Sequence, residues 1–155
     1  MTRLTFTLLF LAASFTATAA KPNFAGEWKL DTAKSDFGDM PSPGELMKQV
    51  THEDTKLVVK EFEAGGLGKQ NAELTYVTDG SSTKNAVRGS EMTSVAKWSG
   101  DTLRINNTIA VAGRTINLSE TWRLTGGGKT LEVLREIGSP EGKSTIKLVF
   151  AKTDK

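Results

Sequence analysis

The 155-residue sequence contains no cysteine, one histidine and one tyrosine. The absence of cysteine excludes disulfides, thiol nucleophiles and thiolate-bound zinc. A metal site at the single histidine, His52, would need further convergent ligands, and no second histidine exists to supply one. Serine and threonine are abundant, but no nucleophile lies at a recognisable spacing from a base. We therefore expect no metal, no cofactor and no enzymatic activity.

The sequence also lacks an excess of either charge, with 20 Lys and Arg against 18 Asp and Glu and a formal net charge of +2. Without Arg3, which lies in a segment expected to be removed, the difference is 19 − 18 = +1. A nucleic-acid-binding domain carries a basic patch or stripe. The Gly-rich segment "GGGK" (126–129) lacks the Gly-Lys-Ser/Thr pattern and the following helix of a phosphate loop. We expect no nucleic-acid partner.

The one long apolar run stands at the start, in "MTRLTFTLLFLAASFTATAA" (1–20). Arg3 precedes an apolar stretch from Leu4 to Phe15, and small residues end the segment at Ala19 and Ala20, which is the layout of a secretory signal peptide. The run is too short for a confident membrane span, and no cysteine follows to carry a lipid anchor. We expect a secreted or periplasmic protein with no membrane span and one domain, residues 21–155.

Proline is scarce, and after residue 20 nearly every segment alternates polar and apolar residues until it reaches a turn. Asp79-Gly80 and Gly113 are typical of tight hairpin turns. Pro41 and Pro43 exclude a long helix in 32–45, so this segment is predicted to be a loop. The predicted strands are 24–31, 46–53, 56–62, 71–78, 82–88, 91–98, 102–111, 114–124, 130–137 and 143–151.

Four strand registers follow if the turns lie at Ser99–Thr102, Gly113-Arg114, Gly126–Lys129 and Ser139–Gly142. They bring the large apolar side chains to one face, which a one-residue slip would destroy. A ten-strand meander with one dry face has two exposed edges unless it closes. We predict an all-β fold, a single antiparallel up-and-down β-barrel of 8–10 strands whose last strand meets its first. The predicted apolar pairs are Trp98 with Leu103, Ile105 with Trp122, Ile109 with Leu118, Trp122 with Val133, and Val133 with Leu148.

The same registers place a polar row on the inward face. Glu120 is predicted opposite Arg135, Asn107 opposite Glu120, and Ser94 opposite Asn107, and a turn centred at Gly89-Ser90 adds Asn85. Buried charges are costly unless they are paired and hydrogen-bonded. The row is either a structural pair in a filled barrel or a polar belt that recognises the head group of a mostly apolar ligand. In the second case the candidate ligand-binding residues are Arg135, Glu120, Asn107, Ser94, Trp122 and Ile109.

The segment "FAGEW" (24–28), with Gly26 and Trp28, resembles the Gly-x-Trp signature on the first strand of the calycins, the superfamily of lipocalins and fatty-acid-binding proteins. "FAGEWKL", "YVTDG" (76–80) and the strand count are similar to the fatty-acid-binding branch, whereas the export signal is more like the lipocalins. The resemblance implies a barrel that binds, or once bound, something apolar. Trp28 would either plug one end of the barrel, the interpretation we favour, or line the ligand cavity.

The resemblance carries over no known ligand contact. The Arg-x-Tyr of fatty-acid-binding proteins is replaced by Leu148-Val149-Phe150, and 32–45 is too short and too rich in proline for their two-helix lid. The lipocalin Thr-Asp-x-x-Tyr motif is also missing, since Thr78-Asp79 runs into Gly80 and two serines.

Two functions remain open. The first is an exported, lipocalin-like, monomeric barrel that binds a small lipophilic or amphiphilic ligand without catalysis. The alternative is a packed barrel that acts through its surface, as an interaction module or protease inhibitor. Some bacterial inhibitors with a similar start work by an N-terminal tail, but here only Lys21 and Pro22 precede Asn23. An interior cavity of roughly a few hundred Å³ would favour the first function, and a filled barrel the second.

Overall fold

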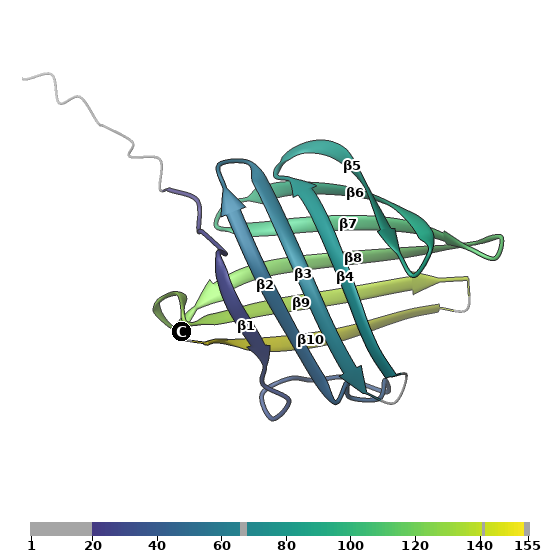
Figure 1. Cartoon of the computed structure of the whole chain (residues 1–155), viewed down its shortest axis with the longest axis horizontal. Helices are drawn as coiled ribbons and strands as arrows, with labels where there is room; N and C mark the ends of the chain where they lie inside the picture. Colours follow the sequence, from purple (N-terminus) through teal and green to yellow (C-terminus); the bar gives the residue numbers. More distant parts are fainter. Residues whose placement is uncertain (1–19, 66–67, 141, 154–155) are drawn as a thin grey trace, which may run out of the picture.

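The computed structural model describes residues 20–65, 68–140 and 142–153, so the predicted signal peptide lies almost entirely outside the described residues. Ten antiparallel strands and one short 3₁₀ turn, η1 (Gly126–Gly128), make up the fold (Figure 1). No helix in this part of the chain is long and apolar enough to cross a membrane. The strands are β1 (Gly26–Leu30), β2 (Glu45–Glu53), β3 (Lys56–Gly65), β4 (Gly68–Val77), β5 (Asp79–Val87), β6 (Ser90–Ser99), β7 (Thr102–Val111), β8 (Arg114–Thr125), β9 (Thr130–Ser139) and β10 (Gly142–Thr153).

The strands form one sheet in the order β4-β3-β2-β1-β10-β9-β8-β7-β6-β5. The last strand meets the first, as predicted, with Trp28 opposite Lys152. In Figure 1 the layer of β1 to β4 crosses in front of the layer of β6 to β10, which is the appearance of a rolled sheet. The predicted all-β, up-and-down barrel is confirmed. It is nearly closed rather than closed, because β4 and β5 end the sheet order and share no ladder.

Three of the four predicted registers are confirmed, and the fourth, between β7 and β8, is wrong by two residues. Trp122 lies opposite Val133, Val133 opposite Leu148, and Trp98 opposite Leu103. In contrast, Leu103 rather than Ile105 lies opposite Trp122, and Ile109 lies opposite Ile116. The reason is the turn: Ala112 and Gly113 both have positive φ (49° and 75°), so the two-residue turn begins one position earlier than predicted.

The hairpin predicted at Asp79-Gly80 does not form. The Thr78 N–H donates to the Thr55 carbonyl (2.8 Å), and the chain continues into β5, where Asp79 pairs with Lys97 of β6. A bulge separates Asp79 from Ser82 in this pairing. The Asp-Gly pair therefore lies at the corner where the barrel opens between β4 and β5.

One end of the barrel is filled with aromatic side chains. Phe24 stacks on Trp98 with ring centroids 5.7 Å apart and meets Trp122 edge-on at 5.6 Å. Trp28 and Trp122 are buried, and Trp98 is partly buried against the same core. The Trp28 indole N–H donates to the Phe24 carbonyl (2.9 Å), which fits its interpretation as a plug. We call this the closed end.

Gly26 explains the spacing of the Gly-x-Trp segment. Its φ of 142° is one that side chains rarely adopt, and a Cβ there would lie 2.6 Å from Cε of Lys152. The glycine thus leaves room for Lys152, whose Nζ lies 5.3 Å from the centroid of the Trp28 ring. The segment closes the seam between β1 and β10.

The opposite end carries the loop from 31 to 44 and is called the mouth. The loop contains no α-helix, as predicted, and is held along β10 by backbone bonds between Asp36 and Lys147 (2.8 and 2.7 Å). The turns β3–β4, β5–β6, β7–β8 and β9–β10 lie at this same end because the strands alternate in direction. The loop follows the rim, with a Cβ at Gly44 only 2.7 Å from the Ala64 carbonyl oxygen.

Candidate functional site

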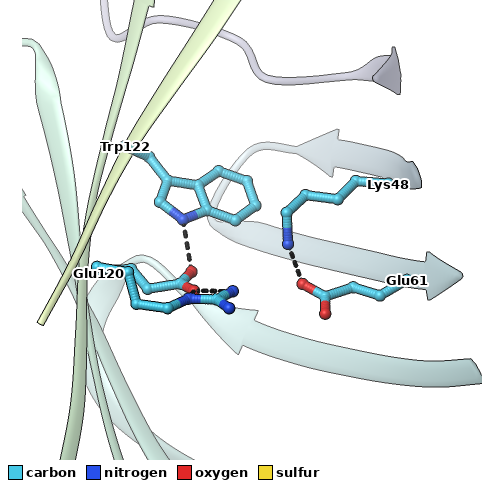
Figure 2. A network of polar contacts seen from close by, with 5 residues as sticks. Lys48, Glu61, Glu120 and Trp122 are labelled. Carbon is cyan, nitrogen blue, oxygen red and sulfur yellow. Dashed lines mark hydrogen bonds and ion pairs between the residues drawn. The ribbon is translucent and has the colours of Figure 1, made fainter. Parts of the chain in front are cut away.

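Glu120 of β8 and Arg135 of β9 are paired inside the barrel. They are cross-strand neighbours, as predicted. Arg135 Nε donates to Glu120 Oε1 (2.7 Å), and its Nη2 lies 2.5 Å from the same oxygen. The Trp122 indole N–H donates to the other carboxylate oxygen (2.8 Å; Figure 2). Only 5% of the Glu120 side chain and 20% of the Arg135 side chain are exposed, so both face inward.

A second ion pair lies in the barrel wall formed by β2 and β3. The Lys48 ammonium group donates to Glu61, and none of the Lys48 side chain is exposed (Figure 2). Its Nζ also lies 5.4 Å from the centroid of the Trp122 ring and 5.5 Å from that of Phe150. These contacts join the two layers of the barrel through one cation.

Sequence reasoning missed this second pair, although a signal was present. Lys48 shares the inward phase of β2 with Leu46 and Val50, which are both buried. A lysine among the inward-facing residues of a strand predicts a buried charge. The residue opposite Lys48 on β3 is Glu61. We call Lys48, Glu61, Glu120 and Arg135 the charge cluster.

The surroundings of Glu120 and Arg135 keep these two side chains ionised. Burial alone would raise the pKa of Glu120, but the charges of Arg135 and Lys48 and hydrogen bonds from Trp122 and Arg135 lower it to about 2. Burial alone would lower the pKa of Arg135. The negative charges of Glu120 and Glu61 outweigh burial and raise this pKa above its usual value. Burial, followed by the charges of Glu120 and Glu61, raises the pKa of the Tyr76 hydroxyl. Glu120 and Arg135 are therefore both ionised at neutral pH.

Three neutral polar residues form a second group, the amide cluster, made of Asn85, Ser94 and Asn107. The Asn85 amide donates to the Ser94 hydroxyl (3.1 Å). It also donates to the Thr75 carbonyl (3.0 Å) and accepts from the Thr75 N–H (2.7 Å), so one side chain spans the opening between β4 and β5. Ser94 lies opposite Asn107, as predicted.

The single predicted polar row is therefore wrong, because it is two clusters. Asn107 lies opposite Leu118 and not Glu120, whose partner on β7 is Ile105. Asn85 lies opposite Met92 and reaches Ser94 diagonally, because the β5–β6 turn is Arg88-Gly89, with φ of 50° and 79°. Both slips are of two residues, which moves partners along the strand but leaves each side chain facing inward.

Asn107 has an unpartnered oxygen. Its side chain is buried, with 3% of the residue exposed. Its Oδ1 accepts no hydrogen bond and is the only such buried side-chain atom among the described residues. Buried acceptors almost always have a partner from protein or water, so this oxygen is an unused acceptor of the interior.

Toward the mouth, the inward face is apolar and incompletely covered. Val87, Ile109, Leu118 and Ile137 have inward phase, yet each is only half-buried. We call these four residues the mouth wall. Leu118 lies directly opposite Asn107, so the amide cluster forms the base of the mouth wall.

Grooves of about 300 to 500 Å³ indent the described part of the molecule. The groove over β7 to β10 includes the inward-facing Asn107, Leu118 and Ile137 among mostly outward-facing residues. The largest runs over the outer face of β1 to β4 beside Met47 and Phe62. Another, of about 470 Å³, lies at the closed end beside His52 and Trp98. Trp28, Trp122 and Phe24 fill the closed half of the barrel.

No protein-family model and no curated protein matches the sequence. Solved structures do match in fold. The zebrafish ileal bile acid-binding protein complexed with cholic acid has a TM-score of 0.60 at 11% identity, over 84% of this chain and 98% of that one. Schistosoma mansoni fatty acid binding protein in complex with arachidonic acid has a TM-score of 0.57 at 13% identity, over 84% and 96%.

A third match is secretory abundant heat soluble protein 4 from Ramazzottius varieornatus, with a TM-score of 0.60 at 16% identity, over 92% of this chain and all of that one. At such identities the likeness shows the fold alone. The fold is a calycin-like barrel of the type found in fatty-acid-binding proteins, as the Gly-x-Trp segment indicated.

Proposed function

We propose that this chain is an exported, monomeric, non-catalytic barrel that binds a small amphiphile at its mouth. The apolar part of the ligand would lie on the mouth wall, and its polar group would point toward the amide and charge clusters. The observation that carries the proposal is the half-buried, inward-facing apolar wall of Val87, Ile109, Leu118 and Ile137. Apolar side chains left accessible on a concave face are the usual lining of a lipid site.

Two further points support it. Solved structures of the same fold include proteins named for binding bile acids, fatty acids and lipids. The secretory proteins of that fold agree with the export predicted from residues 1–20. Asn85 is hydrogen-bonded to Ser94 and Arg135 to Glu120, and these pairs are not arranged as a nucleophile with a base, which agrees with a role in binding.

A displacement assay tests the proposal. A lipophilic fluorescent probe should bind the protein and be released by amphiphiles. Leu118→Glu should weaken binding by more than about tenfold, since it places an unpaired charge on the apolar wall. The control is Ser119→Glu, the neighbouring residue whose hydroxyl bonds to Asn106 on the outer face. Calorimetry and native mass spectrometry that find no bound species across bile acids, fatty acids, alcohols and monoacylglycerols would overturn the proposal.

The alternative, a barrel that acts through its surface, is favoured by one observation: the groove of about 500 Å³ lies over the outer face of β1 to β4. An inhibitory N-terminal tail is disfavoured, because Lys21 donates to the Gly100 carbonyl (2.9 Å) and lies over the Trp98 ring. The failure of the displacement assay would move the function to this surface.

A further inference from the structure

We infer that the ligand's polar group is uncharged and donates a hydrogen bond to Asn107 Oδ1, as an alcohol does. The inference rests on the proposed function and specifies its ligand class. Two independent features of the interior carry it: the charge balance of the charge cluster and the unpartnered oxygen of the amide cluster.

The first feature excludes an anionic head group as the preferred ligand. Arg135 is engaged by Glu120 through two of its nitrogens, and Lys48 is engaged by Glu61 and covered by aromatic rings. Each interior cation thus already has its own carboxylate. A ligand carboxylate would lose its hydration and then meet Glu120 and Glu61 as well as the two cations. Because the charge cluster has no net formal charge, its attraction for a ligand carboxylate does not offset the lost hydration.

The same balance disfavours a cationic head group. Both carboxylate oxygens of Glu120 already accept hydrogen bonds, one from Arg135 and one from Trp122. A ligand ammonium would have to displace one of them. An uncharged polar group needs no such exchange, because its desolvation cost is far smaller than that of an ion.

The second feature specifies what the uncharged group must do. Asn107 Oδ1 is a buried acceptor without a donor, at the base of the mouth wall and opposite Leu118. Its neighbour across β6 and β7, Ser94, is occupied with Asn85. A ligand hydroxyl supplies the missing donor, whereas a carboxylate at neutral pH and an ether supply none. Sites built to hydrogen-bond a ligand reject analogues that lack the bonding group.

A matched ligand series tests the inference at pH 7.4 by competition with a fluorescent probe: 1-decanol, decyl methyl ether and sodium decanoate. The alcohol should bind about three- to tenfold tighter than the ether, which corresponds to one net hydrogen bond. The decanoate should bind at least about tenfold more weakly than the alcohol, because of its uncompensated charge.

Asn107→Leu isolates the contribution of the oxygen. In this variant the preference for alcohol over ether should disappear. Because the same two ligands are compared in both proteins, the difference between their hydration free energies cancels. The control is Asn106→Leu, one residue away on the outer face, where Asn106 accepts from Ser119; it should keep the full preference. Circular dichroism and thermal melts verify that both variants are folded.

The outcomes separate this inference from the proposed function. If none of the three ligands binds, the proposed function fails and the inference with it. If decanoate binds as tightly as decanol, the function stands and the inference is wrong. A preference for alcohol that persists in Asn107→Leu also overturns it, as does equal binding of alcohol and ether, which would mean that resident water already satisfies the oxygen.

Discussion

Glu120 and Arg135 lie side by side in the interior because one register serves both the apolar and the charged positions of β8 and β9. The register that pairs Trp122 with Val133 leaves the two charges opposite each other. Their pairing could be read from the sequence for that reason. The sequence also indicates the Lys48–Glu61 pair, because Lys48 alternates with the buried Leu46 and Val50 on β2, but this pair was not predicted.

The Glu120–Arg135 pair should be strongly coupled in stability. Glu120→Ala or Arg135→Ala alone should lower the free energy of unfolding by about 3–5 kcal/mol, because each leaves a buried charge without its partner. Combining Glu120→Leu with Arg135→Met should recover much of that loss. Urea unfolding measures all three. The control is Glu136→Ala on the same strand, whose ion pair with Arg104 is more than half exposed and should contribute at most about 1 kcal/mol.

Additive losses in that cycle would contradict a dry pair. A double variant that folds well but no longer binds amphiphiles would instead assign the charge cluster to ligand recognition. The pair is thus informative for stability and for binding in one set of variants.

His52 should make stability depend on pH near neutrality. It is 8% exposed, and its Nδ1 accepts the Phe24 N–H (3.2 Å), which requires the neutral ring. Burial lowers the pKa of His52 below its ordinary value of 6.5. The unfolded chain therefore binds more protons than the folded one, and the free energy of unfolding should fall as pH drops below about 6.5.

The measurement is urea unfolding between about pH 7.5 and pH 5.5, with His52→Gln as the comparison. The glutamine variant should lose the slope in this window, because it cannot titrate there. The lowered pKa values of Asp31 and Asp79 start from 3.8, so both groups titrate below the window. Lys21, Asp54 and Asp79 line the groove beside His52. An unchanged slope in His52→Gln would show that another group is responsible.

At the scale of strands, the alternation of residues was a better guide than the turns. Leu103 and Ile105 both face inward, so a register error of two residues left the predicted core face intact. The register errors arose at two turns whose first residues, Arg88 and Ala112, have positive φ. Arginine and alanine are not typical of such a turn position, which favours Gly, Asn or Asp. The opening at Asp79 could not be foreseen, because an Asp-Gly pair is typical of a hairpin and the competing Thr78–Thr55 bond is a tertiary contact.

Asn85 should hold the two strands at that opening together. No ladder joins β4 to β5, and the Asn85 side chain makes both hydrogen bonds to the Thr75 backbone. Asn85→Leu should lower the free energy of unfolding by about 1–3 kcal/mol, because it leaves the Thr75 N–H and carbonyl without these hydrogen bonds. Amide hydrogen exchange should accelerate in β4 and β5 before the other strands.

The control for this change is Lys84→Ala, the adjacent residue, whose exposed pair with Glu91 should contribute little. If exchange accelerates evenly around the barrel in Asn85→Leu, the side chain does not act as a local clasp.

At the scale of the whole molecule, the barrel is divided along its axis. The closed end is filled by Phe24, Trp28 and Trp122, the two polar clusters follow, and the mouth wall lies beyond them. The sequence predicted the barrel, its closing seam and its inward residues, because these depend on alternation. It could not say whether the interior is filled, since that depends on how side chains from non-adjacent strands such as β2 and β8 meet across the barrel.

The most direct test of the central claim, that an amphiphile binds at the mouth, is methyl NMR of the protein titrated with 1-decanol. Binding at the mouth predicts saturable shifts of the Ile109, Leu118 and Ile137 methyl groups and of the Asn107 side-chain amide. Leu57 and Leu131, which are fully buried elsewhere in the core, should show no more than small changes. Shifts confined to the outer groove at Met47, or saturation without any change at Leu118 and Ile137, would contradict the account.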